Sequence, residues 1–184
     1  MITPENVTTN PRLAGLVRRY HTWVILRDQT NAEHSWQVMR IFDELFGWPN
    51  DARLARYVLY HDCGEIVTGD LPYPSKSLNP ELKRTISLAE TTALKNMGIV
   101  IEEITQFDLQ RFKLCHMLEM FERGAEELAM GNKFAEPVMM RCEVAAINMT
   151  LGWYPEQSSP CNYELNHKVV DHISKMKRLM GLET

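Results

Sequence analysis

Apolar residues recur at helical spacing along most of the chain. In 32–46 they return every three or four positions, and Gly47-Trp48-Pro49 then ends the pattern. The longest such stretch covers 109–128 and ends before Gly131-Asn132, a pair typical of a helix C-terminus. A last amphipathic stretch covers 169–180. These spacings predict a long helix in each of the three places.

Further helices are marked by the residues at their ends. Asp51 suits the N-cap of a second helix. Asn79 followed by proline predicts another helix start, with its stop at Gly98, and Pro137 opens a further helix. The segment 68–76 contains two prolines and a glycine, which predicts an ordered loop. Because no strand pattern competes, we expect an all-α fold in which the helices form a single-domain bundle.

The composition of the chain limits which ligands we expect it to bind and where in the cell we expect it to work. The formal net charge is −4 and the cationic residues form no continuous basic stripe, so we expect no polymeric nucleic acid as a ligand, while small anions remain open. No apolar run approaches the roughly 20 residues that a membrane-spanning helix needs. The four cysteines are far apart and form no CxxC pair, as expected for reduced thiols. We therefore expect a cytoplasmic protein with no membrane partner.

Three histidines and one aspartate could meet at a single metal site. His34 is in phase with the apolar positions of its helix, and His116 lies among apolar residues, so both are expected to face the interior or its edge. His61 and Asp62 are consecutive and could touch one ion at a helix end. Such ligands suit a transition ion, namely Zn, Co, Mn, Fe or Ni. Alternatively, His61-Asp62 is a surface turn and the inward histidines are hydrogen-bonded core residues.

Other side chains near these ligands have a functional and an ordinary interpretation. Glu65 could act as general acid or base, or it could be an exposed carboxylate at a helix end. Asp70 could accept a hydrogen bond from a sugar hydroxyl, but aspartate after glycine is also common in turns. Trp36, Trp48 and Phe42 are assigned to the core or to a subunit contact.

Three ordered motifs resemble one family of phosphohydrolases. They are Glu33-His34-Ser35, then Tyr60-His61-Asp62-Cys63-Gly64-Glu65, then Thr68-Gly69-Asp70-Leu71-Pro72-x-Pro74-x-Lys76. This pattern resembles the HD-domain 5′-deoxynucleotidases of the YfbR type and the DatZ-like deoxynucleoside triphosphate hydrolases of phages. The resemblance implies one HD-type helical domain over 1–184, with a motif-bearing core at about 15–150 and a C-terminal helical extension at 153–184. It also implies a homo-oligomer and metal-dependent hydrolysis of small 2′-deoxynucleotides.

The resemblance further implies a role for each site residue. Arg19 and Lys76 would neutralise phosphate charge, unless they are solvated surface cations. Tyr20 stands where the family has tryptophan and could crowd a ribose 2′-hydroxyl, although core packing explains an aromatic there equally well. Asp70 would read the deoxyribose 3′-hydroxyl, and Glu65 would handle the proton.

His116 is a departure from the family pattern. The run Glu126-Glu127-Leu128-Ala129-x-Gly131-Asn132 resembles the family sequence after its last metal ligand, and it aligns His116 with the aspartate found there. The implied ligand set is therefore His34, His61, Asp62 and His116 around one divalent ion. Loss of a carboxylate makes Mg²⁺ a poorer candidate than the transition ions.

Several functions remain open at this point. The chain could remove phosphate from a deoxynucleoside monophosphate, or release triphosphate from a deoxynucleoside triphosphate. The alternative is a catalytically retired nucleotide-binding or scaffold protein with His116 as the lesion, although the retained Arg19, Glu65, Asp70 and Lys76 favour catalysis. A plain helical interaction module is a third possibility, and it predicts that no metal is bound.

Overall fold

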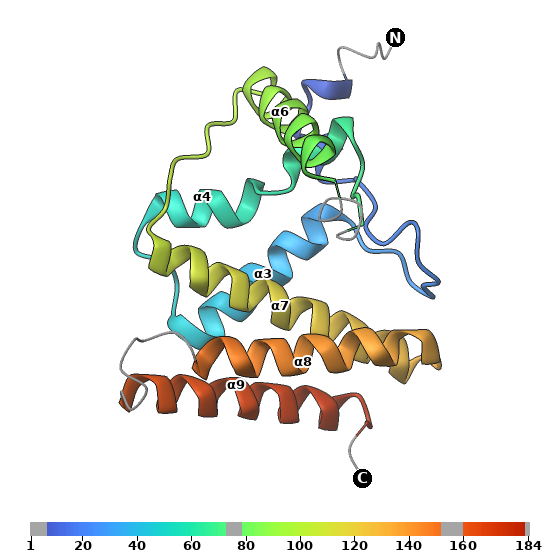
Figure 1. Ribbon diagram of the computed structural model, residues 1–184, viewed down its shortest axis with the longest axis vertical. Coiled ribbons are helices and arrows are strands. Elements are labelled where there is room, and N and C mark those ends of the chain that lie inside the picture. The colour runs from blue at the N-terminus through green and yellow to red at the C-terminus, as the bar shows by residue number, and fades with distance from the viewer. Residues whose placement is uncertain (1–6, 73–78, 152–159, 183–184) are drawn as a thin grey trace. The chain divides into compact units, whose positions relative to one another are not determined.

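The computed structural model describes residues 7–72, 79–151 and 160–182, with side chains from 163 onward in the last range. Regular structure in these ranges is helical apart from one isolated antiparallel bridge between Arg18 and Thr30, so the all-α prediction is confirmed (Figure 1). None of the described helices combines the length and the apolar character needed to cross a membrane. The elements are α2 Pro11–Ala14, α3 Asn31–Phe46, α4 Ala52–Tyr60, η1 Cys63–Val67, α6 Pro80–Asn96, α7 Gln106–Ala129, η2 Lys133–Ala135, α8 Glu136–Leu151 and α9 Pro160–Leu179.

Local side-chain chemistry sets several helix ends, as the sequence predicted. Asp51 and Asn79 accept hydrogen bonds from backbone N–H groups in the first turns of α4 and α6. After α6 and α7, Gly98 and Gly131 have φ of 70° and 101°, a left-handed conformation that glycine adopts without strain. The predicted loop 68–76 is non-helical up to its fifth residue, and the rest of it lies outside the described residues.

The chain divides into two compact units, each of which is described by itself. The first unit contains the described residues of Met1–Val24, Asp28–Trp36 and Asp51–Ile104. The second unit contains those of Ile25–Arg27, Gln37–Asn50 and Thr105–Thr184. The single domain over 1–184, with its core at about 15–150 and its extension at 153–184, stays a prediction.

In the first unit, α6 packs closely on the short helix η1. A Cβ atom on Gly64 would lie 2.7 Å from the Cβ of Glu90, so this approach requires glycine. Next to it, Ala14, Cys63 and Ile99 form a buried apolar cluster. The position of η1 is therefore fixed by packing as well as by its own backbone hydrogen bonds.

Backbone hydrogen bonds also tie the segment before α3 to the start of that helix. The N–H of Arg19 donates to the carbonyl of Gln29 over 2.8 Å, and the N–H of Asn31 donates to the carbonyl of Val17 over 2.9 Å. These bonds flank the isolated bridge. They hold Arg19 next to the N-terminus of α3.

In the second unit, α7, α8 and α9 lie side by side, with α8 between the other two (Figure 1). The contact is mainly apolar, because Phe121 of α7, Ala146 of α8 and Val169 of α9 are fully buried. Burial of a large apolar side chain contributes on the order of 2 kcal/mol. Polar pairs join them as well, among them His172 and Glu122, since Nε2 of the buried His172 lies 2.8 Å from Oε1 of Glu122. Packing of one face of each helix thus builds this unit.

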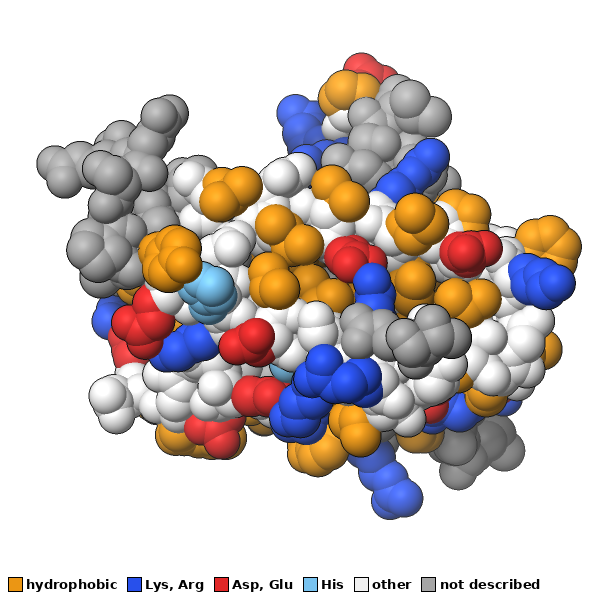
Figure 2. Space-filling view, turned by 90° about the horizontal axis from the view of Figure 1, so that it is seen from below, with side chains coloured by type: hydrophobic (Ala, Val, Ile, Leu, Met, Phe, Trp, Pro, Cys, Tyr) orange, Lys and Arg blue, Asp and Glu red, His pale blue; other side chains and the backbone are white. Residues whose placement is uncertain are grey.

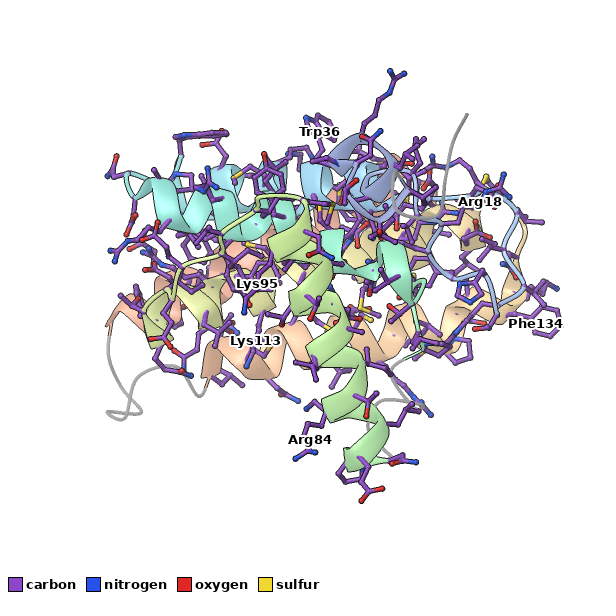
Figure 3. The ribbon with its side chains drawn as sticks, turned by 90° about the horizontal axis from the view of Figure 1, so that it is seen from above. Arg18, Trp36, Arg84, Lys95, Lys113 and Phe134 are labelled. Carbon is purple, nitrogen blue, oxygen red and sulfur yellow. The ribbon has the colours of Figure 1, made fainter. Side chains whose placement is uncertain are left out.

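Trp36 and Trp48 are exposed, which corrects their assignment to the core. Trp36 is 61% and Trp48 is 64% exposed, and Figure 3 shows Trp36 pointing away from the ribbon. Trp36 lies two positions after the buried His34, and two helical steps turn a side chain about 200° away. Trp48 follows the end of α3. Phe42, in contrast, is in the core at 1% exposure, and the assignment of the tryptophans to a subunit contact stays a prediction.

The described cysteines are free thiols, as expected. Cys63, Cys115 and Cys142 are all buried. Burial raises the pKa of Cys63 and of Cys142 to about 11, so neither forms a thiolate at neutral pH. The side chain of Cys161 lies outside the described residues.

Candidate metal centre

His34, His61 and Asp62 lie together in the first unit. His34 stands in the first turn of α3 and is fully buried, as its helix phase predicted. His61 caps the end of α4, and Asp62 follows it. The Nε2 atoms of His34 and His61 lie 3.7 Å and 3.2 Å from Oδ2 of Asp62, and one ligand atom of each residue lies within 4.8 Å of the others. Two imidazoles and a carboxylate at this spacing can hold a metal ion.

The contact of His61 with Val58 leaves Nε2 as the ring nitrogen that faces Asp62. Its Nδ1 atom lies 2.8 Å from the carbonyl oxygen of Val58. Because a carbonyl can only accept, Nδ1 carries the hydrogen, and the neutral ring then has its lone pair on Nε2. A hydrogen bond from the distal ring nitrogen to a carbonyl is typical of histidines that ligate metals.

Burial and charge determine the protonation of the three groups. Burial, followed by the cationic Arg19, lowers the pKa of His34 well below its ordinary value, which favours the neutral, ligating imidazole. Burial opposes protonation of His61, but the Asp62 carboxylate outweighs burial and raises the pKa of His61. Burial also opposes ionisation of Asp62, yet His61 and then Arg19 hold the pKa of Asp62 well below its ordinary range. Asp62 is therefore a carboxylate at neutral pH, the form that binds a cation.

Arg19 is buried against Asp62, so its interpretation as a solvated surface cation is wrong. The Arg19 side chain is 6% exposed, and Nη1 donates to Oδ2 of Asp62 over 2.5 Å. The carboxylate compensates the desolvation of the guanidinium, which would otherwise be costly in this position. A guanidinium offers several donors in a planar fork, so Arg19 could also contact a phosphate.

Glu65 is buried and held by Asn31, a residue that the helical spacing does not single out. Glu65 is 5% and Asn31 is 2% exposed. The Nδ2 atom of Asn31 donates to Oε2 of Glu65 and to the carbonyl of Asp62, both over 3.0 Å. The interpretation of Glu65 as an exposed carboxylate is therefore wrong, because a buried donor satisfies it. An asparagine at the start of an apolar helix would be read as a cap, and that is the signal its sequence position offers.

Asp70 and Tyr20 are joined by a hydrogen bond in the first unit. The backbone N–H of Tyr20 donates to Oδ2 of Asp70 over 2.9 Å. Tyr20 has a φ of 58°, a left-handed conformation uncommon for residues other than glycine. Asp70 therefore stabilises this turn, while contacts of Asp70 and of the half-buried Tyr20 with a sugar stay predictions. Lys76 lies outside the described residues.

His116 lies on α7 in the second unit. It is half-buried, and its ring centroid lies 5.8 Å from that of the buried Phe112 one turn earlier. The neighbouring Cys115 and Leu118 are buried. The expectation that His116 faces the edge of the interior is confirmed, and its place in a ligand set stays a prediction.

The structure resembles a solved structure of a phage enzyme over its whole length. This is the cyanophage S-2L HD phosphohydrolase DatZ bound to dA and one catalytic Zn²⁺ ion, with a TM-score of 0.65 and 18% sequence identity. The match covers 100% of this chain and 98% of the phage chain. At this level of identity, the likeness shows the fold, which is that of an HD phosphohydrolase.

Sequence comparison identifies relatives in bacteria. A 5′-deoxynucleotidase of Vibrio parahaemolyticus is 31% identical over 109 residues, which are 55% of this chain and 56% of the relative. A 5′-deoxynucleotidase of Vibrio cholerae is 30% identical over 105 residues, 53% of this chain and 54% of the relative. The chain thus spans about half the length of the curated relatives it matches. The family model described as 5′-deoxynucleotidase YfbR-like matches residues 12–123, more than half of the chain. The chain therefore belongs to the YfbR-like 5′-deoxynucleotidase family.

Proposed function

We propose that this chain is a divalent-metal-dependent phosphohydrolase that acts on 2′-deoxynucleotides. The observation that carries the proposal is the group formed by His34, His61 and Asp62, whose ligand atoms lie within 4.8 Å of one another. A buried cation, Arg19, contacts the same carboxylate. The names of the Vibrio relatives and the dA bound to the phage enzyme support a deoxynucleotide as the substrate.

His34, His61 and Asp62 would hold the ion, with His116 as the fourth ligand. Support for His116 comes from its half-buried place on α7, at the position where the resemblance implies a metal-binding aspartate. With imidazole in place of a carboxylate, the set favours Zn, Co, Mn, Fe or Ni over Mg²⁺. When bound, the ion would polarise a phosphoryl oxygen and lower the pKa of a coordinated water.

The remaining residues would bind the substrate and move a proton. Glu65 would take a proton from the attacking water and return it to the leaving oxygen, and its burial supports a fixed position for this exchange. Arg19 would bind a phosphoryl oxygen, because a phosphate drawn toward the ion also approaches the guanidinium beside Asp62. Asp70 would read the 3′-hydroxyl, Tyr20 would exclude a 2′-hydroxyl, and Lys76 would add a second cation.

The 5′-phosphate of a deoxynucleoside monophosphate is the group that the names of the bacterial relatives favour. Release of triphosphate from a deoxynucleoside triphosphate is the other outcome of the same chemistry. A retired nucleotide-binding protein is the second candidate function, favoured by the imidazole of His116 at the position where the resemblance implies a carboxylate.

The test is product release by metal-stripped protein with Zn²⁺, Co²⁺, Mn²⁺ or Mg²⁺ added. Deoxynucleoside mono- and triphosphates would be supplied with their ribose counterparts. We expect phosphate release with a transition ion, loss of bound metal and turnover in His61→Gln, and no loss in His167→Gln, an exposed histidine of α9. Nucleotide binding without turnover under every metal would favour the retired protein, and a chain that binds neither metal nor nucleotide would contradict both.

We also propose that the protein works in the cytoplasm as a homo-oligomer. The buried free thiols of Cys63, Cys115 and Cys142 support a reducing compartment. Exposed apolar side chains on α8, among them Val144 and Leu151 at 57% and 58%, support a contact between copies. The face shown in Figure 2 likewise exposes hydrophobic side chains between charged ones.

A further inference from the structure

We propose that Asn31 is a positioning residue for Glu65. Its side-chain amide would hold the Glu65 carboxylate at a fixed distance from the metal ligand Asp62. This inference rests on the proposed function, because the position of Glu65 matters for turnover only if Glu65 exchanges a proton with substrate or water.

The amide of Asn31 connects the two acidic residues directly. A primary amide has two N–H donors, and Nδ2 of Asn31 has two acceptors at 3.0 Å, the carbonyl of Asp62 and Oε2 of Glu65. The same Asp62 carbonyl accepts the backbone N–H of Glu65 over 3.0 Å. One amide therefore cross-links the backbone of the metal ligand to the side chain of the acid.

Asn31 is itself fixed in place. It begins α3, its own N–H donates to the carbonyl of Val17 over 2.9 Å, and the next N–H, of Ala32, donates to the carbonyl of Gly15 over 3.0 Å. Its side chain is 2% exposed. His34 stands one helical turn further along the same helix. Asn31 therefore fixes the position of Glu65 relative to Asp62, which Asn31 contacts, and relative to His34, which lies on the same helix.

The donors of Asn31, and not its acceptor, explain an asparagine here. The Oδ1 atom of Asn31 is buried and accepts no hydrogen bond from the described residues. An apolar side chain would avoid the cost of that unsatisfied acceptor, but it would leave the buried Glu65 carboxylate without this donor. What an apolar residue cannot supply is the pair of N–H donors, so the feature that explains asparagine is its hold on Asp62 and Glu65.

The hydrogen bond also restricts the orientation of the Glu65 carboxyl group. The amide N–H of Asn31 occupies one lone pair of Oε2, and an amide does not give up its own hydrogen at neutral pH, so the carboxylate is held without being protonated by its partner. Proton transfer depends steeply on such orientation, because a donor and an acceptor must meet within hydrogen-bond distance.

The test is a double-mutant cycle on turnover. The wild type, Asn31→Ala, Glu65→Gln and the double variant are compared at steady state, with substrate in excess of enzyme. We expect Asn31→Ala to lower kcat roughly 10- to 100-fold with KM and metal content little changed, and to cost little more in the Glu65→Gln background. Asn31→Asp keeps the shape but has no donors, and we expect it to lose at least as much.

Asn132→Ala is the matched control. Asn132 is also buried and donates to a glutamate, Glu127, over 2.8 Å, so its loss should affect stability without the loss of kcat. An equal loss of kcat from Asn31→Ala in both backgrounds, or unchanged kcat in Asn31→Ala and Asn31→Asp, would overturn this inference and leave the proposed function intact. A wild type that binds metal but turns over no nucleotide would overturn both.

Discussion

At the scale of single residues, the Asp70 carboxylate has one structural role and one proposed role in substrate binding. Its Oδ2 atom accepts the backbone N–H of Tyr20, whose left-handed φ of 58° costs about 1 kcal/mol or more in a residue with a Cβ atom. The proposed contact with a 3′-hydroxyl needs an acceptor on the same carboxyl group. The two tasks can be separated by chemistry, because the turn needs one acceptor oxygen and does not need a negative charge.

Asp70→Asn and Asp70→Ala should therefore differ in stability and not only in activity. Asn keeps an acceptor for the N–H of Tyr20, so we expect its unfolding free energy to fall by less than about 0.5 kcal/mol. Ala removes the acceptor and should lose about 1–2 kcal/mol. Urea unfolding measures the difference, and KM for a 2′-deoxynucleotide against its 2′,3′-dideoxy analogue reports the sugar contact. Equal stability of the two variants would contradict the role of Asp70 in the turn.

The sequence predicts some of these residue positions and misses others for a physical reason. His34 was found because helical phase relates it to the apolar side of α3, and the structure buries it completely. The burial of Arg19 and of Asn31 was not found, because both act through partners, Asp62 and Glu65, that lie more than 30 positions away. The spacing of residues along one helix gives no information about a side-chain contact between two separate segments of the chain.

At the scale of elements, helix ends were predictable where the capping group is local. Asp51 and Asn79 bond to N–H groups two or three residues ahead, a contact that depends only on nearby sequence. The short helix η1 was not predicted. Its place depends on the approach of α6 to Gly64, where a Cβ atom would meet the backbone of Glu90 at 2.8–2.9 Å. Such packing is a property of two elements together.

In the second unit, the carboxylate of Glu127 near the end of α7 holds several neighbouring groups together. The Glu127 carboxylate accepts the backbone N–H groups of Leu26 and Arg27 over 2.7 Å and 3.1 Å, and it pairs with Arg123 over 2.6 Å and with Asn132 over 2.8 Å. We call this group the Glu127 clamp. It fastens the segment Ile25–Arg27 to the end of α7, which gives Glu127 a structural role.

The Glu127 clamp predicts loss of stability in acid. Burial raises the pKa of Glu127, but the bonds from Asn132, Leu26, Arg27 and Arg123 outweigh it and leave the pKa below its ordinary value of 4.5. The clamp therefore contributes fully above pH 4.5 and loses its contribution as the pH falls through the lower folded pKa. We expect Glu127→Gln to cost about 3 kcal/mol at neutral pH, with a smaller difference from wild type in acid.

Urea unfolding of wild type and Glu127→Gln across this pH range measures the effect. The matched control is Glu126→Gln, the next carboxylate along α7, which pairs with Arg27 and Arg123 but is 37% exposed. An exposed pair contributes little, so this control should lose less than about 1 kcal/mol. A stability difference for Glu127→Gln that does not shrink in acid would show that the clamp does not depend on the charge.

At the scale of the whole molecule, α8 has two apolar faces, and one of them is buried within the second unit. Met139, Cys142, Ala146 and Thr150 are buried. Another set recurs at steps of three and four, the spacing of a helix that packs against a partner helix, and it consists of Pro137, Met140, Val144, Ile147 and Leu151. Met140, Val144 and Leu151 are each more than half exposed. We call this set the α8 stripe.

A second copy of the chain fits the α8 stripe by charge as well as by apolar character. Glu136 and Arg141 are exposed and flank the stripe five positions apart. In two parallel helices paired through such a stripe, residues at this separation face each other across the contact, so Glu136 of one copy would meet Arg141 of the other. The net charge of −4 opposes association at long range, and such a pair would offset part of that repulsion locally.

Val144→Glu places a charge at the middle of the α8 stripe and should dissociate the oligomer. Burying an unpaired carboxylate costs several kcal/mol, enough to shift a typical dimer to monomer at micromolar concentration. Light scattering after size exclusion gives the mass of each species. Val170→Glu on α9, where valine is 37% exposed outside the stripe, should keep the wild-type mass. Because Val144 is exposed, the Val144→Glu monomer should remain folded. Turnover retained by this monomer would show that the metal centre is complete in one chain. A wild type that is monomeric at every concentration would contradict the assignment of this surface.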